Sequence, residues 1–169
     1  MTAGEKLMTT PSIANKLDDI VPADKAAKIS GLDYLLAILH GEFPAPPISQ
    51  TMNYKLIDVT SGRVVFRGSP NFSTLNPMGT VHGGWYGTLL DSAMACAVST
   101  KVDTGFISST LEFKINIIRS IPLGMEVDAI GETDHAGRST GVATGRILGV
   151  DDQKLYATGS TTCIIMKVA

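Results

Sequence analysis

The run His82-Gly83-Gly84 contains the residue types with which a protein can stabilise a negative charge that develops on an oxygen atom. Residues 85–99 follow it, contain no proline and are rich in Ala, Leu and Met, so they predict a helix that begins at or near the glycines. The first N–H groups of a helix have no acceptor within the helix and lie at the positive end of its dipole. Because glycine leaves room for a carbonyl group, Gly83 is a candidate oxyanion donor.

Asp91 places a carboxylate on the same rigid element. It lies nine residues after His82, about 2.5 turns along the predicted helix. It is the only acidic or basic side chain between His82 and Lys101, and its neighbours are apolar. A carboxylate in such surroundings is unfavourable unless it has partners or a chemical task. Taken alone, the segment also fits a turn followed by a helix with a pairing or capping Asp.

Length and composition narrow the class of protein. A chain of 169 residues fits one compact domain, and a formal net charge of −2 gives no electrostatic reason to expect nucleic acid or an anionic membrane surface as partner. The two cysteines, Cys96 and Cys163, lie far apart in apolar runs, and no Cys/His cluster predicts a metal site. No segment approaches about 18 consecutive apolar residues. We therefore expect a soluble, cytoplasmic protein without a metal.

The chain divides into a polar N-terminal part and a patterned remainder. Residues 1–23 predict a flexible tail, and residues 24–169 predict a single domain. Helical periodicity begins at Asp24, is carried by leucines at spacings of three and four residues, and ends near Gly41 and Pro44. Residues 43–48, with two consecutive prolines, predict a stiff extended connector.

Strand patterns surround the central helix. Alternation and turn residues predict strands over 52–59, 63–67, 110–117, 125–133, 140–150 and 155–166, the last four as a meander with short connections. In the 110–117 strand, Leu111, Phe113, Ile115 and Ile117 are predicted on the buried face and Thr110 on the other. The central helix is apolar most of the way round, so other elements must wrap it. We predict an α+β fold in which a six-stranded antiparallel sheet curls around a long central helix, with an extra N-terminal helix.

These motifs resemble those of the hotdog-fold acyl-CoA thioesterases of the phenylacetate-degradation and 4-hydroxybenzoyl-CoA type. The similarity rests on Asn76, Gly79, the His82-Gly83-Gly84 run and Asp91, and it extends over about residues 30–166. It implies hydrolysis of an acyl-CoA, aromatic or medium- to long-chain aliphatic, to the free acid and CoA, with no cofactor beyond the CoA of the substrate. It also implies a homodimer, or a tetramer built as a dimer of dimers, with active sites at the subunit interface.

The resemblance implies a role for each matching residue. Asp91 is similar to the catalytic carboxylate, acting as nucleophile or as general base for water, and the Gly83 N–H resembles the oxyanion donor. Asn76 resembles the amide that places the thioester or the water, while His82 orients the loop and the substrate carbonyl. Some family members place a hydroxyl residue four positions after the acid. Here that position is Ala95, so Ser92 and Thr88 are the nearby candidates to hold Asp91.

Residues expected to contact substrate are Gly84, Thr88 and Arg138, the last at a hairpin tip as a candidate contact to the CoA phosphates. Two other functions remain open. A hotdog-fold dehydratase or hydratase removes a proton next to a thioester carbonyl with a histidine and a carboxylate, and a non-catalytic acyl-CoA binding protein needs no carboxylate at that place. The acyl group is not predicted by the sequence.

Overall fold

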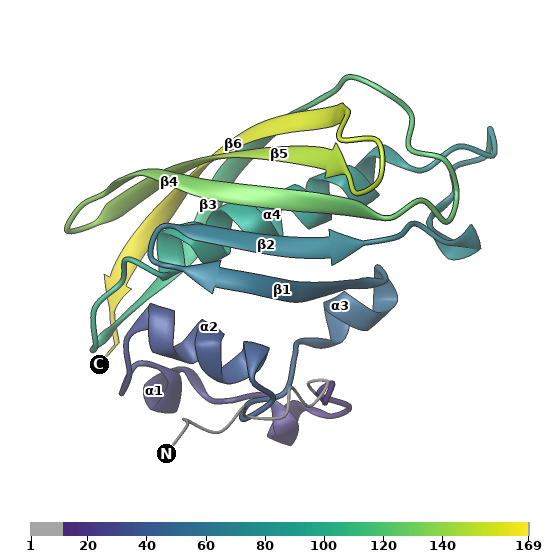
Figure 1. Ribbon diagram of the computed structural model, residues 1–169. Helices are drawn as coiled ribbons and strands as arrows, with labels where there is room; N and C mark the ends of the chain where they lie inside the picture. Colours follow the sequence, from purple (N-terminus) through teal and green to yellow (C-terminus); the bar gives the residue numbers. More distant parts are fainter. Residues whose placement is uncertain (1–11, 169) are drawn as a thin grey trace, which may run out of the picture.

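A computed structural model describes residues 12–168, in which six antiparallel strands curl around one long helix, α4 (Gly83–Ser99) (Figure 1). The strands are β1 (Tyr54–Thr60), β2 (Arg63–Gly68), β3 (Phe106–Ile117), β4 (Val127–Ala136), β5 (Thr140–Gly149) and β6 (Leu155–Lys167). A helix precedes the sheet, α2 (Gly31–Leu39). The predicted hotdog fold, with its central and N-terminal helices, is confirmed.

The order of strands in the sheet is β1-β2-β4-β5-β6-β3, so the predicted meander of four strands is wrong in one respect. Only β4, β5 and β6 form it, while β3 pairs with β6 and lies at the edge. Residues 118–126 connect β3 to β4, and this segment is too long and too rich in turn residues, including Pro122, for a hairpin. The strand before the meander is therefore free to pair with the last strand.

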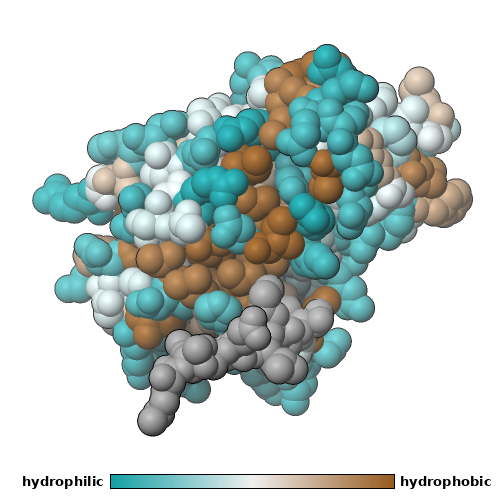
Figure 2. Space-filling view, viewed as in Figure 1, coloured by the Kyte–Doolittle hydropathy of each residue, from teal (hydrophilic) through white to brown (hydrophobic). Residues whose placement is uncertain are grey.

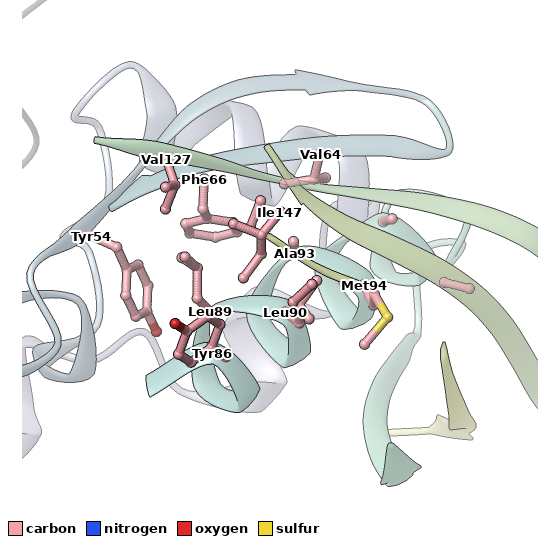
Figure 3. Close-up of a cluster of buried hydrophobic side chains, with 14 of the residues drawn as sticks. Tyr54, Val64, Phe66, Tyr86, Leu89, Leu90, Ala93, Met94, Val127 and Ile147 are labelled. Carbon is pink, nitrogen blue, oxygen red and sulfur yellow. The ribbon is translucent and has the colours of Figure 1, made fainter. Parts of the chain in front are cut away.

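Helix α4 supplies the centre of the core. Its side chains Leu89, Leu90, Ala93 and Met94 have no exposed surface and point toward the strands (Figure 3). Burying a large apolar side chain fully contributes roughly 1.5–3 kcal/mol, so this helix holds much of the sheet by packing alone. The consequence for function is that α4 is a rigid support for the side chains on its remaining, less buried face.

Gly131 in β4 allows the closest approach of the sheet to α4. A Cβ atom there would lie 2.2 Å from the backbone carbonyl oxygen of Ala93. We expect Gly131→Ala to lower the free energy of unfolding by roughly 1–3 kcal/mol because the helix must move away from the strand. Thermal unfolding followed by circular dichroism measures this. Gly83→Ala is the control, since its Cβ meets only Ile117 Cδ1 at 3.4 Å. Equal melting temperatures for the two variants would contradict the packing argument.

The N-terminal helical region is split, whereas the sequence predicts one helix from Asp24. A short helix α1 (Ala23–Ala26) is followed by α2, which begins at Gly31 because Ser30 caps it: the Ser30 hydroxyl accepts the N–H of Asp33 at 3.1 Å. The predicted extended connector is correct only to Pro46. Pro47 opens a further helix, α3 (Pro47–Thr51), where proline is favoured because the first helical N–H needs no partner.

Part of the segment predicted as a flexible tail is described. Residues 1–11 lie outside the described part of the chain. Residues 12–22 include a short 3-10 helix, η1 (Leu17–Asp19), and pack along the connector: Ala14 is buried, and its N–H donates to the carbonyl of Ala45 at 3.0 Å. Residues 12–22 therefore cover the same side of the molecule as α1 and α2.

Candidate active site

The loop that leads into α4 is shaped by Asn76. Its side-chain oxygen accepts the N–H groups of Met78 at 2.9 Å and Thr80 at 3.2 Å, and its Nδ2 donates to Thr80 Oγ1 at 2.8 Å. The loop also contains a short 3-10 helix, η2 (Phe72–Thr74). The amide predicted to place a substrate or water thus holds its own turn together, with one N–H hydrogen left over. In this chain Asn76 fixes the position of the loop.

His82 caps the N-terminus of α4. Its backbone is extended, at φ −64° and ψ 139°, and its Nδ1 accepts the N–H of Gly84 at 2.8 Å. A ring nitrogen that accepts a hydrogen bond carries no proton, so the proton of the neutral ring is on Nε2. His82 is exposed, and Nε2 is available to donate a hydrogen bond. The orienting role predicted for His82 fits this geometry.

The Gly83 N–H is the donor that the cap leaves unused. It is at the first helical position, and among residues 12–168 no acceptor for it is found. The 17 residues of α4 place the positive end of their dipole at this group. Gly84, whose own N–H is taken by His82, lines a cavity of about 450 Å³ together with His82, Trp85 and Thr88. The start of α4 therefore has a free donor at Gly83, and the next residue, Gly84, lines an open space.

Asp91 lies half-buried on the side of α4 that faces β3. Its carboxylate Oδ1 accepts a hydrogen bond from the Thr110 hydroxyl at 2.9 Å. Burial raises the pKa of Asp91 above its ordinary value, and the bond from Thr110 acts in the opposite direction because it stabilises the charged form. A carboxylate with one oxygen bonded and a raised pKa has the properties of a general base.

A β-bulge in β3 brings Thr110 to this carboxylate, and the prediction that Thr110 faces away from the helix is wrong. Between Thr110 and Glu112 the register with β6 shifts by one residue. One extra residue moves the side chains that follow to the other face, so Thr110 and Phe113 both face α4. Phe113 lies against Gly87 of that helix. Bulges are common beside active sites because they redirect a single side chain in this way.

The two hydroxyl residues predicted to hold Asp91 have other partners. The Ser92 hydroxyl is bonded to the Tyr54 hydroxyl at 2.9 Å, and the Thr88 hydroxyl donates to the carbonyl of Gly84, one turn earlier, at 2.9 Å. That prediction is therefore wrong, and Thr110 takes the role. Nothing local in the sequence identifies Thr110, since it lies 19 residues from Asp91. The one sequence feature that could point to Thr110 is that it is a hydroxyl residue in a strand predicted to pack on the helix.

A single chain does not bring all the predicted site residues together. His82, Gly83, Gly84 and Thr88 lie at the start of α4, but Asp91 is eight residues from Gly83, about 12 Å along the helix. Arg138 is exposed at the tip of the β4–β5 hairpin, at the opposite end of the sheet from the 69–82 loop (Figure 1). One small carbonyl group cannot touch both Asp91 and Gly83 of the same chain.

The edge strand β3 carries an exposed apolar rim. Leu111, Phe113 and Ile117 are 59%, 44% and 48% exposed, although the sequence predicts them on a buried face. They are exposed because β3 lies at the sheet edge and no described element covers it. An unpaired edge with large apolar side chains is typical of a surface that another chain covers.

Other kinds of site find no support in the described part of the chain. Within residues 12–168, no group of three or more His, Cys, Asp or Glu side chains is arranged to hold a metal ion. None of the helices described is long and apolar enough to span a bilayer.

Comparisons with known proteins agree with the fold. Residues 78–156 match the model of the thioesterase superfamily. A conserved protein of Pseudomonas aeruginosa is 30% identical, with 71% of this chain and 94% of that chain covered and a TM-score of 0.65. A thioesterase family protein from Silicibacter pomeroyi is 23% identical (72% and 90% covered, TM-score 0.67), and the PaaI protein of the phenylacetic acid degradation operon of E. coli is 22% identical (72% and 84%, TM-score 0.64). No curated protein matches the chain.

Proposed function

This chain belongs to the thioesterase superfamily, and we propose that it acts as an acyl-CoA thioesterase, which hydrolyses an acyl-CoA to the free acid and CoA. Thioester hydrolysis in general follows from the family. The CoA ester as substrate, the residues that act and the cytoplasm as location are our proposals.

The observation that carries the proposal is the contact between Asp91 and Thr110. A carboxylate on an otherwise apolar helix is bonded through Oδ1 to a hydroxyl that a β-bulge has turned toward it, at 2.9 Å. Among residues 12–168 no hydrogen-bond partner for Oδ2 is found, so this oxygen is available to accept a proton. A carboxylate without a chemical role would gain nothing from the bulge in β3 that turns the Thr110 hydroxyl toward it. It would also gain nothing from the partial burial that raises its pKa.

We propose that Asp91 acts as general base for water. Asp91 Oδ2 takes one proton from a water molecule as the water oxygen forms a bond to the thioester carbon. The carbonyl oxygen becomes negative, and the Gly83 N–H stabilises it, with His82 Nε2 donating a second hydrogen bond. The C–S bond then breaks. The sulfur leaves as the CoA thiolate and recovers the proton from Asp91, so the carboxylate is regenerated and no cofactor is consumed.

The spacing within α4 supports a site shared between two subunits. Because Asp91 lies about 12 Å from Gly83 of its own chain, we propose that it acts with Gly83 of the partner subunit. The exposed apolar rim on β3 supplies a surface for a homodimer, and a dimer of dimers is compatible with it. We propose that Arg138, which lies at the far end of the sheet, contacts the CoA phosphates.

The geometry of His82 argues against the dehydratase alternative. A histidine base needs an unprotonated nitrogen directed at the substrate, but His82 Nδ1 is occupied by the N–H of Gly84. A non-catalytic binding protein would not need the contact between Asp91 and Thr110. Hydrolysis uses both features.

The experiment that tests the proposal is release of free thiol from a panel of aromatic and aliphatic acyl-CoAs. We expect turnover of at least one member at a rate far above spontaneous hydrolysis. If no acyl-CoA is hydrolysed although the chain binds them, the proposal is wrong and a binding protein is the better description.

Thr110→Val tests how the hydroxyl tunes Asp91. The variant removes the hydrogen bond that lowers the pKa of Asp91 and leaves burial, which raises it. The ionised base then forms at higher pH, so the acidic limb of the profile of kcat/KM against pH should move to higher pH. Thr110→Ser, which keeps the hydroxyl, should retain the wild-type limb. An unmoved limb in Thr110→Val would show that Thr110 does not tune the group that titrates.

A further inference from the structure

A cavity that the proposed chemistry does not use lies between the N-terminal elements and α4. Its volume is about 210 Å³, and its walls are mostly apolar. Leu35 and Ile38 of α2, Ile48 of α3 and Leu56 of β1 contribute to it, and Ser92 and Cys96 line it from α4. On the face seen in Figure 2, apolar side chains gather where the N-terminal helices meet β1. The cavity is built largely by residues that precede the sheet.

The part of α4 that lines the cavity adjoins the candidate catalytic residue in the chain. Ser92 directly follows Asp91, and Cys96 is a little over one turn further along α4. Burial, followed by the negative charge of Asp91, raises the pKa of Cys96 to about 12. Two of the polar groups in the wall satisfy each other, because the hydroxyls of Ser92 and Tyr54 bond at 2.9 Å. The surface that the cavity offers to a ligand is mostly apolar.

A second hollow continues from the first. It measures about 570 Å³ and shares Ile20, Val21 and Tyr34 with the cavity. It extends to Ser99 of α4 and to Phe106 at the start of β3. From Ser92 to Ser99 the path follows α4 for seven residues, about 10 Å. The two spaces therefore form an elongated, mostly apolar path that begins at Ser92, the residue after Asp91, and passes Tyr34.

We propose that the part of this path up to Tyr34, which is the cavity of about 210 Å³ and is here called the acyl channel, holds the acyl group of the substrate as a linear aliphatic chain of medium length. The inference rests on the proposed function and names its substrate class. The acyl channel comprises the residues that line the cavity, with Tyr34 at the boundary to the second hollow.

Capacity and shape favour a chain over a ring. An apolar cavity of about 150 Å³ accepts benzene with its six carbons, so about 210 Å³ accommodates about eight carbons on the same scale. Each buried methylene strengthens binding by about fourfold. A flexible chain can follow the path along α4, whereas a flat ring has no use for the extension beyond Tyr34. The thioester carbon remains at Asp91 while the chain runs under α2.

Ile48→Trp tests the acyl channel by filling it. Ile48 is 43% exposed, so a larger side chain is compatible with folding while its ring enters the cavity. We expect kcat/KM for octanoyl-CoA to fall at least tenfold and that for butyryl-CoA to stay within twofold. Gln50→Trp on the same helix is the matched control, because Gln50 is exposed and does not line the cavity. It should leave both values unchanged.

Tyr34→Ala should act in the opposite direction. Loss of the ring widens the passage between the two spaces, so the preferred acyl chain should lengthen by about two to four carbons, since each buried methylene adds to binding. Melting curves of each variant verify that it is folded. Equal losses for all chain lengths, or a wild type that prefers phenylacetyl-CoA to octanoyl-CoA, would overturn the acyl channel while leaving thioester hydrolysis in place.

Binding of the free product separates the two proposals. Titration calorimetry should show octanoate binding to the wild type and to Gln50→Trp, and at least tenfold weaker binding to Ile48→Trp. Octanoate binding without hydrolysis of any acyl-CoA would support the acyl channel and reject the thioesterase. Hydrolysis without this difference in binding would reject the acyl channel alone.

Discussion

Asp91→Asn should lower turnover of the best acyl-CoA by about two to four orders of magnitude, as expected for the loss of a general base or nucleophile. The substitution keeps the shape of the side chain and an oxygen that can accept the Thr110 hydroxyl, whose bond to Asp91 measures 2.9 Å. An amide oxygen, however, cannot take a proton from water at neutral pH. KM should change little, because the carboxylate is not needed to bind the acyl chain or CoA.

The measurement is thiol release by wild type and Asp91→Asn under identical conditions, with circular dichroism to verify the fold. Asp103→Asn serves as the control, because this exposed carboxylate lies between α4 and β3 and is not part of the site. It should retain full activity. If Asp91→Asn also retains most of the activity, Asp91 is not the catalytic group, and the Asp91–Thr110 contact must be explained as a structural one.

The sequence predicts the parts of the site that are local. His82, Gly83 and Gly84 are consecutive. Glycines that precede an apolar run without proline are expected at a helix start, because helix starts depend on the local sequence. Asp91 follows from the same helix at a fixed spacing. The six strands also follow from alternation and turn residues. These features depend on neighbours within a few residues, so they need no knowledge of the tertiary structure.

The sequence misses what depends on register and pairing. The bulge between Thr110 and Glu112 changes which side of β3 faces the helix, and a one-residue shift reverses every assignment on one side of it. The pairing of β3 with β6 is also missed, because the order of the strands along the chain does not reveal it. The cavity under α2 depends on how the segments from residue 14 to Phe66 pack together. Contacts between segments that are distant along the chain cannot be recognised from a few neighbouring residues.

Gly83→Pro should lower turnover by about two to three orders of magnitude, because it removes one oxyanion donor. The Gly83 N–H has no acceptor among residues 12–168, so its loss breaks no bond there. Proline is favoured at the first position of a helix, and the extended backbone of His82 is the conformation that a residue before proline prefers. The helix should therefore remain intact while the donor is lost.

Gly83→Ala is the matched control, since it adds a carbon but keeps the N–H. Its Cβ would lie 3.4 Å from Ile117 Cδ1, an ordinary contact. We expect near wild-type activity from it. Comparable losses in the two variants would mean that the space at this position, and not the hydrogen bond, is what matters.

A mixed dimer of Asp91→Asn and Gly83→Pro chains tests whether the site is shared. If Asp91 of one subunit acts with Gly83 of the other, one site in the mixed dimer carries both defects and the other carries none. Co-expression with two different tags allows this dimer to be isolated, and it should recover about half of the wild-type activity although each parent is nearly inactive. If both residues act within one chain, every site of the mixed dimer carries one defect and activity stays low. The roughly 12 Å between the two residues on α4 makes recovery the expected result.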